Sequence, residues 1–166
     1  RSAWWARSPR GSRKGVRGQA PVRDLVEVAV PVAELTETAL REWGEALGAS
    51  IAPGSILALE GDLGAGKTTL AQAIARGWGV PTEVTSPTYA IVHEYTSPRG
   101  PLHHLDLYRL ERPEQLAQIG WDEILRTRGL VIIEWAERAG DALPRDIQRI
   151  RLAHLGAEPS RRQVTW

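Results

Sequence analysis

The sequence predicts an α/β fold in three layers, with helices on both faces of a central, mostly parallel β-sheet that has antiparallel edge strands. Segments with strand-like and helix-like patterning alternate along the chain from Asp24 onward. Residues 130–133 are wholly apolar, which is typical of a strand buried on both faces of a parallel sheet. The chain has 166 residues, 42% of them hydrophobic, and is therefore long enough to bury one substantial core.

The predicted elements follow one another in a regular order. Residues 24–30 alternate and are rich in valine, which predicts a short strand. Residues 33–50 place apolar side chains, Leu35 and Leu47 among them, at helical spacing, with Gly48 as a plausible stop. The later elements are a strand at 55–60, a helix at 67–79 ended by Gly77 and Gly79, a loop at 81–89, strands at 89–95 and 102–108, a helical stretch at 111–129 with a break near Gly120, a buried strand at 129–135, and paired strands at 146–155 and 161–166, the last at an edge.

The first 23 residues differ in composition from the rest of the chain. They carry seven basic side chains and no acid, whereas residues 24–166 carry 14 basic and 20 acidic ones. The segment is rich in Gly, Ser, Pro and Arg without periodicity, so we interpret 1–23 as a disordered basic extension and 24–166 as the folded domain. A nucleic-acid-binding arm or a transit peptide would share this composition, but we favour an upstream extension without a selected role.

Composition also excludes some classes of protein. No apolar run approaches the roughly 18 residues that a membrane helix needs, so we expect no membrane partner. The chain has no cysteine, which excludes a disulfide framework and a thiolate metal site. These features fit a cytoplasmic protein, which is the location that we expect.

Residues 61–68, Gly-Asp-Leu-Gly-Ala-Gly-Lys-Thr, match the phosphate-binding pattern GxxxxGK followed by Thr. The pattern binds nucleoside triphosphates because its glycines let successive backbone N–H groups face one anion, in front of the positive end of a helix. Lys67 would reach the β- and γ-phosphates, and the Thr68 hydroxyl would ligate Mg²⁺. The sequence therefore predicts a P-loop NTPase-like fold that binds ATP and Mg²⁺, with phosphate-binding residues Gly61, Asp62, Leu63, Gly64, Ala65, Gly66, Lys67, Thr68 and the adjacent Thr69.

Two acids stand at the predicted carboxyl ends of strands, where α/β sheets bind their ligands. Asp106 ends the strand that contains His103 and His104, and Glu134 ends the apolar strand. Each can bind the metal directly or through water, or can orient the attacking water. We therefore take Lys67, Asp106 and Glu134 as candidate catalytic residues, and Thr68, Asp106 and Glu134 as candidate metal ligands.

Missing motifs narrow the class of P-loop protein. A Ras-type GTPase needs Asn-Lys-x-Asp, and Lys67 is the only lysine after Lys14. The Ser-Gly-Gly-Gln signature of transporter ATPases is absent, and AAA-type and helicase motors need longer chains. A small-molecule kinase fits the length, although no Arg-rich lid is evident. A nucleotide-gated binding module with little turnover is a further alternative.

Four motifs, GDLGAGKTT, SPTY, HLDLYRL and IEW, occur in an order and at spacings that resemble the TsaE (YjeE) family, over about residues 24–155. These are small bacterial P-loop ATPases required for threonylcarbamoylation of adenosine 37 in tRNA. The resemblance implies a weak Mg²⁺-dependent ATPase that acts as the partner of the TsaB–TsaD pair, which performs the transfer. Contact with tRNA would be indirect, through that complex.

The resemblance also implies roles for individual residues. Thr88, in the switch-like SPTY segment, would sense the γ-phosphate, Asp106 would be the essential aspartate, and Glu134 would lie near Mg²⁺. Trp135 matches an aromatic that follows that glutamate, and the helix start at Glu37 corresponds to a region beside the nucleotide base. Thr36 and Glu37 are equally typical of an ordinary helix N-terminus.

Other polar and aromatic residues favour structural interpretations. His103 and His104 face opposite sides of a strand, so we expect one to be partly buried and the other exposed. Arg161 and Arg162 could approach the nucleotide, but we favour a solvated strand end for both. The remaining candidates are interpreted as core, sheet or interface aromatics (Tyr89, Tyr95, Tyr108, Trp43, Trp78, Trp121) and as solvated arginines (Arg109, Arg112).

Overall fold

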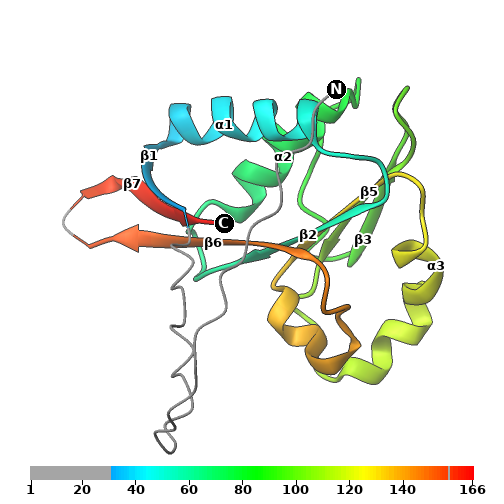
Figure 1. Cartoon of the computed structure of the whole chain (residues 1–166). Coiled ribbons are helices and arrows are strands. Elements are labelled where there is room, and N and C mark those ends of the chain that lie inside the picture. Colours follow the sequence, from blue (N-terminus) through cyan, green and yellow to red (C-terminus); the bar gives the residue numbers. More distant parts are fainter. Residues whose placement is uncertain (1–30, 157) are drawn as a thin grey trace, which may run out of the picture.

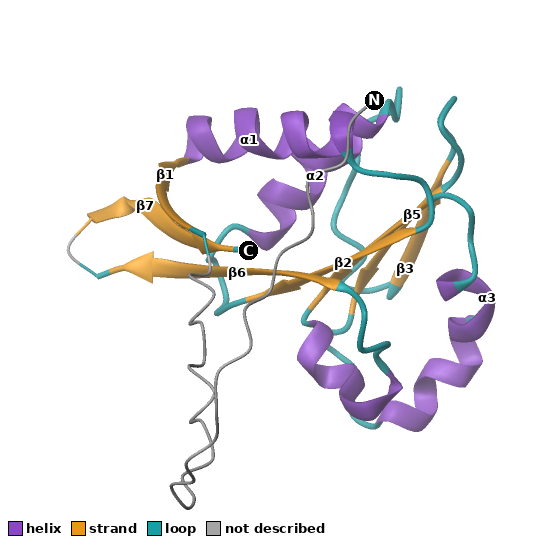
Figure 2. Cartoon of the chain, viewed as in Figure 1, coloured by secondary structure: helices purple, strands orange, loops and turns teal. Residues whose placement is uncertain are grey.

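A computed structural model describes residues 31–156 and 158–166, which form one seven-stranded sheet with helices on both faces (Figures 1 and 2). The strand order is β1-β7-β6-β2-β5-β4-β3. Strands β6, β2, β5 and β4 pair in parallel, whereas β1–β7, β7–β6 and β3–β4 pair antiparallel. The predicted mostly parallel centre and antiparallel edges are confirmed. The strands are β1 Val32–Thr36, β2 Ser55–Glu60, β3 Val92–Tyr95, β4 Leu102–Asp106, β5 Leu130–Glu134, β6 Gln148–Leu155 and β7 Glu158–Thr165.

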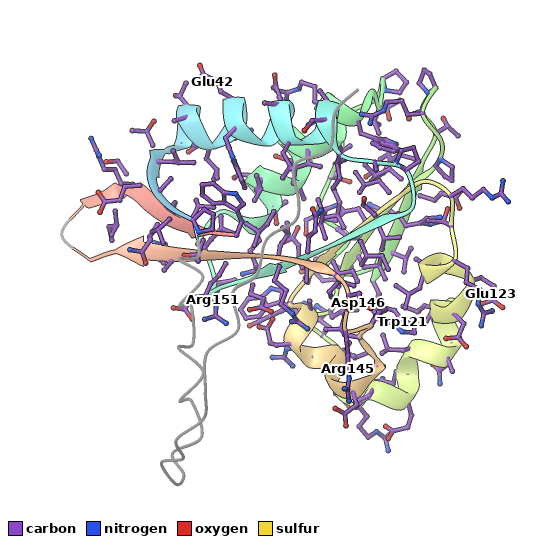
Figure 3. The ribbon with its side chains drawn as sticks, in the orientation of Figure 1. Glu42, Trp121, Glu123, Arg145, Asp146 and Arg151 are labelled. Atoms are coloured by element: carbon purple, nitrogen blue, oxygen red, sulfur yellow. The ribbon has the colours of Figure 1, made fainter. Side chains whose placement is uncertain are left out.

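The helices lie in two groups that cover opposite faces of the sheet (Figure 1). Helices α1 (Glu37–Ser50) and α2 (Lys67–Trp78) pack on one face. The other face carries α3 (Trp121–Leu125) and two 3₁₀ helices, η1 (Pro113–Ile119) and η2 (Ala136–Ala142). Glu42 of α1 and Glu123 of α3 point away from the sheet on these opposite sides, as solvent-facing positions should (Figure 3). No helix in the described residues is long and apolar enough to cross a membrane.

Strand β5 shows why its sequence is continuously apolar. Leu130 and Ile132 belong to the core beneath α1 and α2, whereas Val131 and Ile133 belong to the core on the opposite face. Successive side chains of a strand point to opposite faces, so a strand covered on both sides needs apolar residues at every position. The same alternation places Glu134 on the α2 face of the sheet.

Two glycines predicted as helix stops have a packing role instead. Gly48 lies inside α1, and Gly77 lies inside α2, which ends one residue later and is capped by Gly79 with φ +96°. A Cβ atom on Gly48 would lie 2.0 Å from the Ile74 carbonyl oxygen, and one on Gly77 would lie 2.0 Å from that of Glu45. Both glycines are therefore required by the close contact between α1 and α2.

The structure corrects the predicted elements near the N-terminus and at the edge. The strand predicted at 24–30 and the basic extension lie outside the described residues. Leu35, predicted to be helical, belongs to β1, and Thr36 ends that strand and caps α1 by accepting from the Ala39 N–H. Strand β7 pairs with β6 as predicted but is not an edge strand, because β1 pairs with its other side.

Two further segments are shorter than predicted. Strand β3 begins only at Val92, because residues 89–91 form a turn in which the Ile91 N–H donates to the Pro87 carbonyl and Ile91 has φ +67°. The helical stretch at 111–129 contracts to η1 and α3, and the predicted break occurs at Gly120, with φ +71°.

Candidate nucleotide-binding site

The phosphate-binding loop joins the end of β2 to the start of α2. Gly61 has φ +136°, and a Cβ atom there would lie 2.1 Å from the Leu152 carbonyl oxygen of β6. Gly66 has φ +104° and precedes α2, whose N-terminus receives no side-chain cap. The first backbone N–H groups of α2 are therefore available to an anion in front of the helix.

Lys67 is the first residue of α2 and is almost completely buried. Its Nζ donates to the carbonyl oxygens of Gly61 and Asp62, at 2.6 and 2.8 Å, and lies 3.8 Å from the centre of the Trp135 ring. Burial lowers the pKa of Lys67 below its ordinary value of 10.5, although four neighbouring carboxylates, Glu134 first among them, oppose the shift. The ammonium is thus held at the loop, where a phosphate would stabilise its charge.

The backbone turns sharply immediately after β5. Trp135 has φ +55°, a conformation that is uncommon for a residue other than glycine, and its N–H donates to the Leu59 carbonyl of β2 at 3.2 Å. The turn places the indole beneath Lys67 and beside Tyr108, whose ring centre is 5.1 Å away. Local strain of this kind is typical of residues held in place for function.

Sheet register brings the two predicted acids together. Strands β4 and β5 are parallel neighbours, and Asp106 pairs with Glu134 at their carboxyl ends. Both side chains are buried, at 3% and 2% exposure, and both line one cavity with Lys67 and Thr68. Residues that are far apart in the sequence therefore converge on the phosphate-binding loop.

Each oxygen of Glu134 has its own hydrogen-bond donor. The Thr68 hydroxyl donates to Oε2 at 2.8 Å, and His104 Nε2 lies 2.8 Å from Oε1. Because a carboxylate only accepts hydrogen bonds, the Thr68 proton points at Glu134 and the lone pairs of the hydroxyl face away from it. Thr68 is therefore oriented to offer its oxygen to a cation.

Asp106 is held by different partners. Its Oδ2 accepts from the hydroxyls of Thr88 at 2.5 Å and Ser86 at 3.3 Å, and those two hydroxyls lie 2.7 Å apart. Its Oδ1 accepts from the Tyr108 N–H at 2.9 Å. The segment 86–88 therefore closes over the end of β4 by bonding to the acid.

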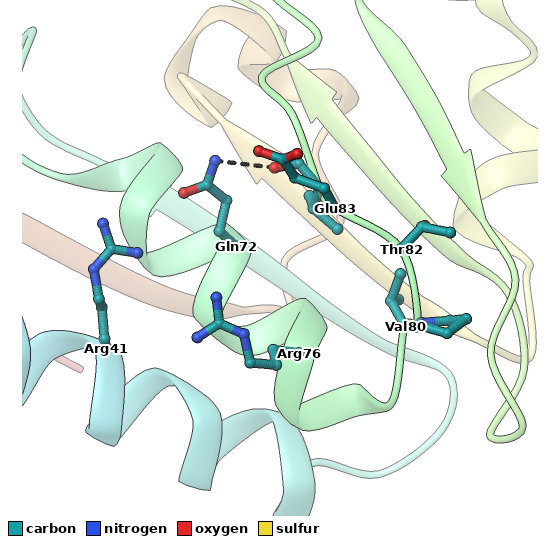
Figure 4. Close-up of a pocket in the computed structure, with 8 residues that line it drawn as sticks. Arg41, Gln72, Arg76, Val80, Thr82 and Glu83 are labelled. Carbon is teal, nitrogen blue, oxygen red and sulfur yellow. Dashed lines mark hydrogen bonds between the residues drawn. The ribbon is translucent and has the colours of Figure 1, made fainter.

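The segment leading to Ser86 is anchored to α2. The Gln72 side chain donates to the Val84 carbonyl oxygen at 2.9 Å, across a hollow of about 520 Å³ that Arg41 and Arg76 also line (Figure 4). Val84 is buried in the core beneath α1 and α2. This bond connects the helix that carries Lys67 with the chain that carries Thr88.

Two adjoining cavities surround the loop. The first, of about 280 Å³, is lined by six of the predicted phosphate-binding residues and by both acids, and the second, of about 220 Å³, extends toward α1 and β7. Both include Gly64, Gly66 and Thr69, so they meet at the loop. The first is lined by Leu63, Gly64, Gly66, Lys67, Thr68, Thr69, Thr88, Asp106, Tyr108, Glu134 and Trp135, and the second by Glu37, Leu40, Gly64, Gly66, Thr69 and Arg162.

Three predicted loop residues contribute differently. Gly61 and Asp62 supply the carbonyl oxygens that bind Lys67 and line a neighbouring cleft, not the two cavities. Ala65 is completely buried, and its N–H donates to the Asp62 carbonyl at 3.1 Å. They shape the loop, whereas Leu63 is 73% exposed at the cavity rim.

Several predictions about individual side chains were wrong. His104 is completely buried and bonds to Glu134, and His103 is half-buried instead of exposed. Tyr89, predicted as a core or sheet aromatic, is 86% exposed with the Arg109 guanidinium over its ring, because the turn at 89–91 carries it outward. Arg162 is half-buried and lines the second cavity instead of lying at a solvated strand end.

Sequence reasoning missed the roles of His104, Ser86 and Tyr108. For His104 a signal existed: it lies two residues before Asp106, so strand alternation places both on one face. For Ser86 and Tyr108 the signal was only proximity to the predicted residues Thr88 and Asp106. The hydroxyl contact and the backbone N–H contact depend on how the two loops close, which no local pattern specifies.

The site offers hard oxygen donors to a metal ion. Thr68, Asp106 and Glu134 present one hydroxyl and two carboxylates at one cavity wall. Within the described ranges, no group of three or more His, Cys, Asp or Glu side chains is arranged to hold a metal. This set fits Mg²⁺, which binds through few protein oxygens and completes its shell with waters and substrate phosphates.

A parallel α/β sheet with a glycine-rich loop before a helix, a buried lysine in that loop and two strand-end acids defines a protein of the P-loop class. Comparison with known proteins then identifies the family. The model for "Threonylcarbamoyl adenosine biosynthesis protein TsaE" matches residues 35–164, and the chain belongs to this TsaE family.

Individual relatives agree with this assignment. The chain is 49% identical over 98 residues to the tRNA threonylcarbamoyladenosine biosynthesis protein TsaE of Nostoc sp., covering 57% of this chain and 60% of that protein. It is 39% identical to the Bacillus subtilis protein of the same name, covering 69% of this chain and 70% of that protein. The crystal structure of Bacillus subtilis YdiB superposes with a TM-score of 0.65 at 30% identity, covering 82% of this chain and 84% of that one.

Proposed function

We propose that the protein binds ATP with Mg²⁺ and hydrolyses it slowly, and that this activity serves the threonylcarbamoylation of adenosine 37 in tRNA. The observation that carries the proposal is the convergence of buried Lys67, Asp106 and Glu134 on one cavity at the phosphate-binding loop. Each of these groups has a defined task in transfer of a phosphoryl group to water.

The loop would bind the phosphates of ATP. Lys67, now bonded to two loop carbonyls, would turn its ammonium to the β- and γ-phosphates, together with the N–H groups at the start of α2. Thr68 and the acids Asp106 and Glu134 would hold Mg²⁺. When bound, the metal neutralises charge on the phosphate oxygens.

The acids would also order the water that attacks the γ-phosphate. Either carboxylate can accept a proton of that water, Asp106 from the end of β4 or Glu134 from the end of β5. Thr88 bonds to Asp106 and lies at the cavity wall, so it would report the presence of the γ-phosphate to the segment 86–88. Glu37 and the second cavity would accommodate the base and ribose.

Family membership supports a place for the proposed activity in tRNA modification. The relatives found in Nostoc sp. and Bacillus subtilis are called tRNA threonylcarbamoyladenosine biosynthesis proteins. We propose that this chain acts with TsaB and TsaD, which perform the transfer, and contacts tRNA only through that complex. ATP hydrolysis would then sustain turnover and would not supply the transferred group.

A reconstituted modification assay tests the proposal. Purified TsaB and TsaD are supplied with unmodified tRNA and the threonylcarbamoyl donor, with and without this protein, and modified adenosine and released phosphate are both measured. We expect repeated rounds of modification only with the wild-type protein and ATP, and none with Lys67→Ala. Phosphorylation of a metabolite without TsaB and TsaD would favour a kinase, and ATP-dependent complex formation without turnover would favour a binding module.

A further inference from the structure

His104 stands apart from the other buried polar residues. Within the described part of the chain, four polar or charged side chains are buried, and three of them, Lys67, Asp106 and Glu134, face the proposed site. The fourth is His104, which is completely inaccessible and lines neither cavity at the loop. A buried imidazole costs stability unless its polar atoms are satisfied, so its presence requires an explanation.

The imidazole makes one hydrogen bond. Nε2 lies 2.8 Å from Glu134 Oε1, and Nδ1 is buried without a hydrogen-bond partner. Because the Glu134 carboxylate can only accept, Nε2 carries the proton. The ring therefore donates a hydrogen bond to Glu134 while its Nδ1 stays buried without a partner. An apolar side chain at this position would leave no polar atom unsatisfied.

The bond continues toward the phosphate-binding loop. Glu134 Oε2, the other oxygen of the same carboxylate, accepts from the Thr68 hydroxyl at 2.8 Å. Strand register explains the alignment, because His104 pairs with Ile132, two residues before Glu134 on the same face of β5. The side chains of His104, Glu134 and Thr68 thus form a continuous chain from the core of the sheet to α2.

We infer that His104 is a positioning residue of the nucleotide site, which fixes Glu134 and through it the Thr68 hydroxyl in the orientation that accepts Mg²⁺. The inference rests on the proposed function. His104 touches neither nucleotide nor metal; it holds Oε1, so Oε2 alone is presented to Thr68. Without this bond the glutamate side chain regains rotamers that do not orient Thr68, and the cation site loses its preorganisation.

His104 should affect nucleotide binding only when Mg²⁺ is present. Lys67 and the loop N–H groups bind phosphate without help from His104, so affinity for ADP in the presence of a chelator should not change in a His104 variant. Affinity in the presence of Mg²⁺ should fall by roughly 10- to 100-fold, which is the usual effect of losing a residue that supports a metal ligand. The ratio of the two affinities isolates the effect on the metal.

Three substitutions separate positioning from packing. His104→Gln retains an amide donor near the Nε2 position, His104→Asn carries the same amide closer to the backbone, and His104→Leu has no donor. The matched control is His103→Gln, the same change one residue earlier on the opposite face of β4. Isothermal titration with ADP, with Mg²⁺ and with chelator, gives the ratio for each variant, and thermal unfolding reports folding.

We expect the ratio of ADP affinity with Mg²⁺ to ADP affinity with chelator to stay at the wild-type value in His104→Gln and His103→Gln. In His104→Asn and His104→Leu we expect this ratio to fall. An unchanged ratio in the Asn variant, or equal losses in the Gln and Asn variants, would overturn the inference. If the Leu variant fails to fold, the Gln and Asn pair decides. A wild-type protein that gains nothing from Mg²⁺ would instead refute the proposed function, so the two failures are distinguishable.

Discussion

The carboxyl ends of β4 and β5 lie side by side in register, and each presents a buried acid to the same cavity. Their supports differ. Glu134, at the end of β5, is bonded to the core residue His104 and to the first turn of α2. Asp106, at the end of β4, is bonded by hydroxyls of the loop segment 86–88, in which Ser86 is exposed.

This difference separates a fixed acid from a responsive one. Rearranging Glu134 would require movement of the sheet or of α2, both of which belong to the main core. Rearranging Asp106 requires two loop hydroxyls and the Tyr108 N–H to change partners, but no movement of the sheet or of α2, and the hydroxyls can exchange partners readily because they both donate and accept. We therefore expect the β5 end to hold the site together and the β4 end to change with the bound nucleotide.

Lys67→Met should have the largest effect, because under the proposed function both strand ends act on a phosphate that Lys67 would bind. We expect ATP hydrolysis to fall by roughly 100-fold or more, as when a single charge-stabilising donor is removed from an active site. A phosphate-release assay measures the loss, with Arg145→Met, a change at an exposed residue that lines neither cavity, as a control.

The same substitution should leave the ligand-free protein as stable as the wild type, or more stable. Burial lowers the pKa of Lys67 in the folded protein, so the folded state disfavours the ammonium at pH values below that lowered pKa. The advantage of the methionine should be present at pH 7 and disappear as the pH rises toward the unfolded value of 10.5. Thermal unfolding of the wild type and of Lys67→Met across this pH range tests the prediction. A methionine variant that is less stable than the wild type at pH 7 would contradict it.

Alanine substitution of the two acids sharpens the comparison of stability. Glu134→Ala leaves the His104 Nε2–H buried without an acceptor, which should cost about 1–3 kcal/mol. Asp106→Ala should cost less, because Ser86 and Thr88 lie 2.7 Å apart and can bond to each other. Denaturant unfolding without nucleotide measures both. Equal losses of unfolding free energy, or a larger loss for Asp106→Ala, would contradict the proposed difference between the ends of β4 and β5.

Thr88→Val removes one hydroxyl from the β4 end and leaves the β5 end intact. We expect the preference for ATP over ADP to narrow by roughly tenfold, because a hydrogen bond to a charged group contributes about 1.5 kcal/mol or more. Competition binding with both nucleotides measures the preference. Ser86→Ala, which removes the longer bond to Asp106, should have a smaller effect.

Glu60 ends β2, a third strand whose carboxyl end carries an acid. Its substitution should have the smallest effect on ATP hydrolysis. Burial raises the pKa of Glu60, but bonds from Arg149 and Arg151 outweigh it, so the pKa lies below its ordinary value of 4.5. A carboxyl whose pKa is depressed on folding stabilises the folded state at pH values above its ordinary pKa. This stabilisation is lost as the pH falls through the folded-state pKa. Glu60→Gln should reduce the acid sensitivity of unfolding without changing ATP hydrolysis. A large loss of hydrolysis in Glu60→Gln would contradict the restriction of the catalytic role to Asp106 and Glu134.

The sequence specified the parts of the fold that depend on local patterns. The positions in the fold of the loop from Gly61 to Thr68 and of Asp106 and Glu134 were predictable, because strand ends and a glycine-rich turn have local signatures. Leu35 was assigned to a helix because its partner in β7, Arg162, is more than a hundred residues away, and strand pairing overrode the helical spacing.

The site was less predictable than its principal residues. His104 was interpreted only as one of two histidines on opposite sides of a strand, because the pairing of β4 with β5 that brings it to Glu134 is a tertiary contact. The exposure of Tyr89 follows from the positive φ of Ile91 two residues later, which no propensity for valine, isoleucine or tyrosine indicates. The supports of this site therefore depend on tertiary contacts, and its rim depends on the geometry of a turn.

The most direct test of an ATPase site completed by two strand ends is phosphate release by the wild type, Asp106→Asn, Glu134→Gln and the double variant, measured together with ATP affinity. Amides preserve the shape of both acids and can still accept from Tyr108 and His104. We predict that each single variant hydrolyses ATP at least about 100-fold more slowly and that the double variant shows no further large loss, because the acids act as a unit. Wild-type hydrolysis by the double variant would contradict the assignment of both residues.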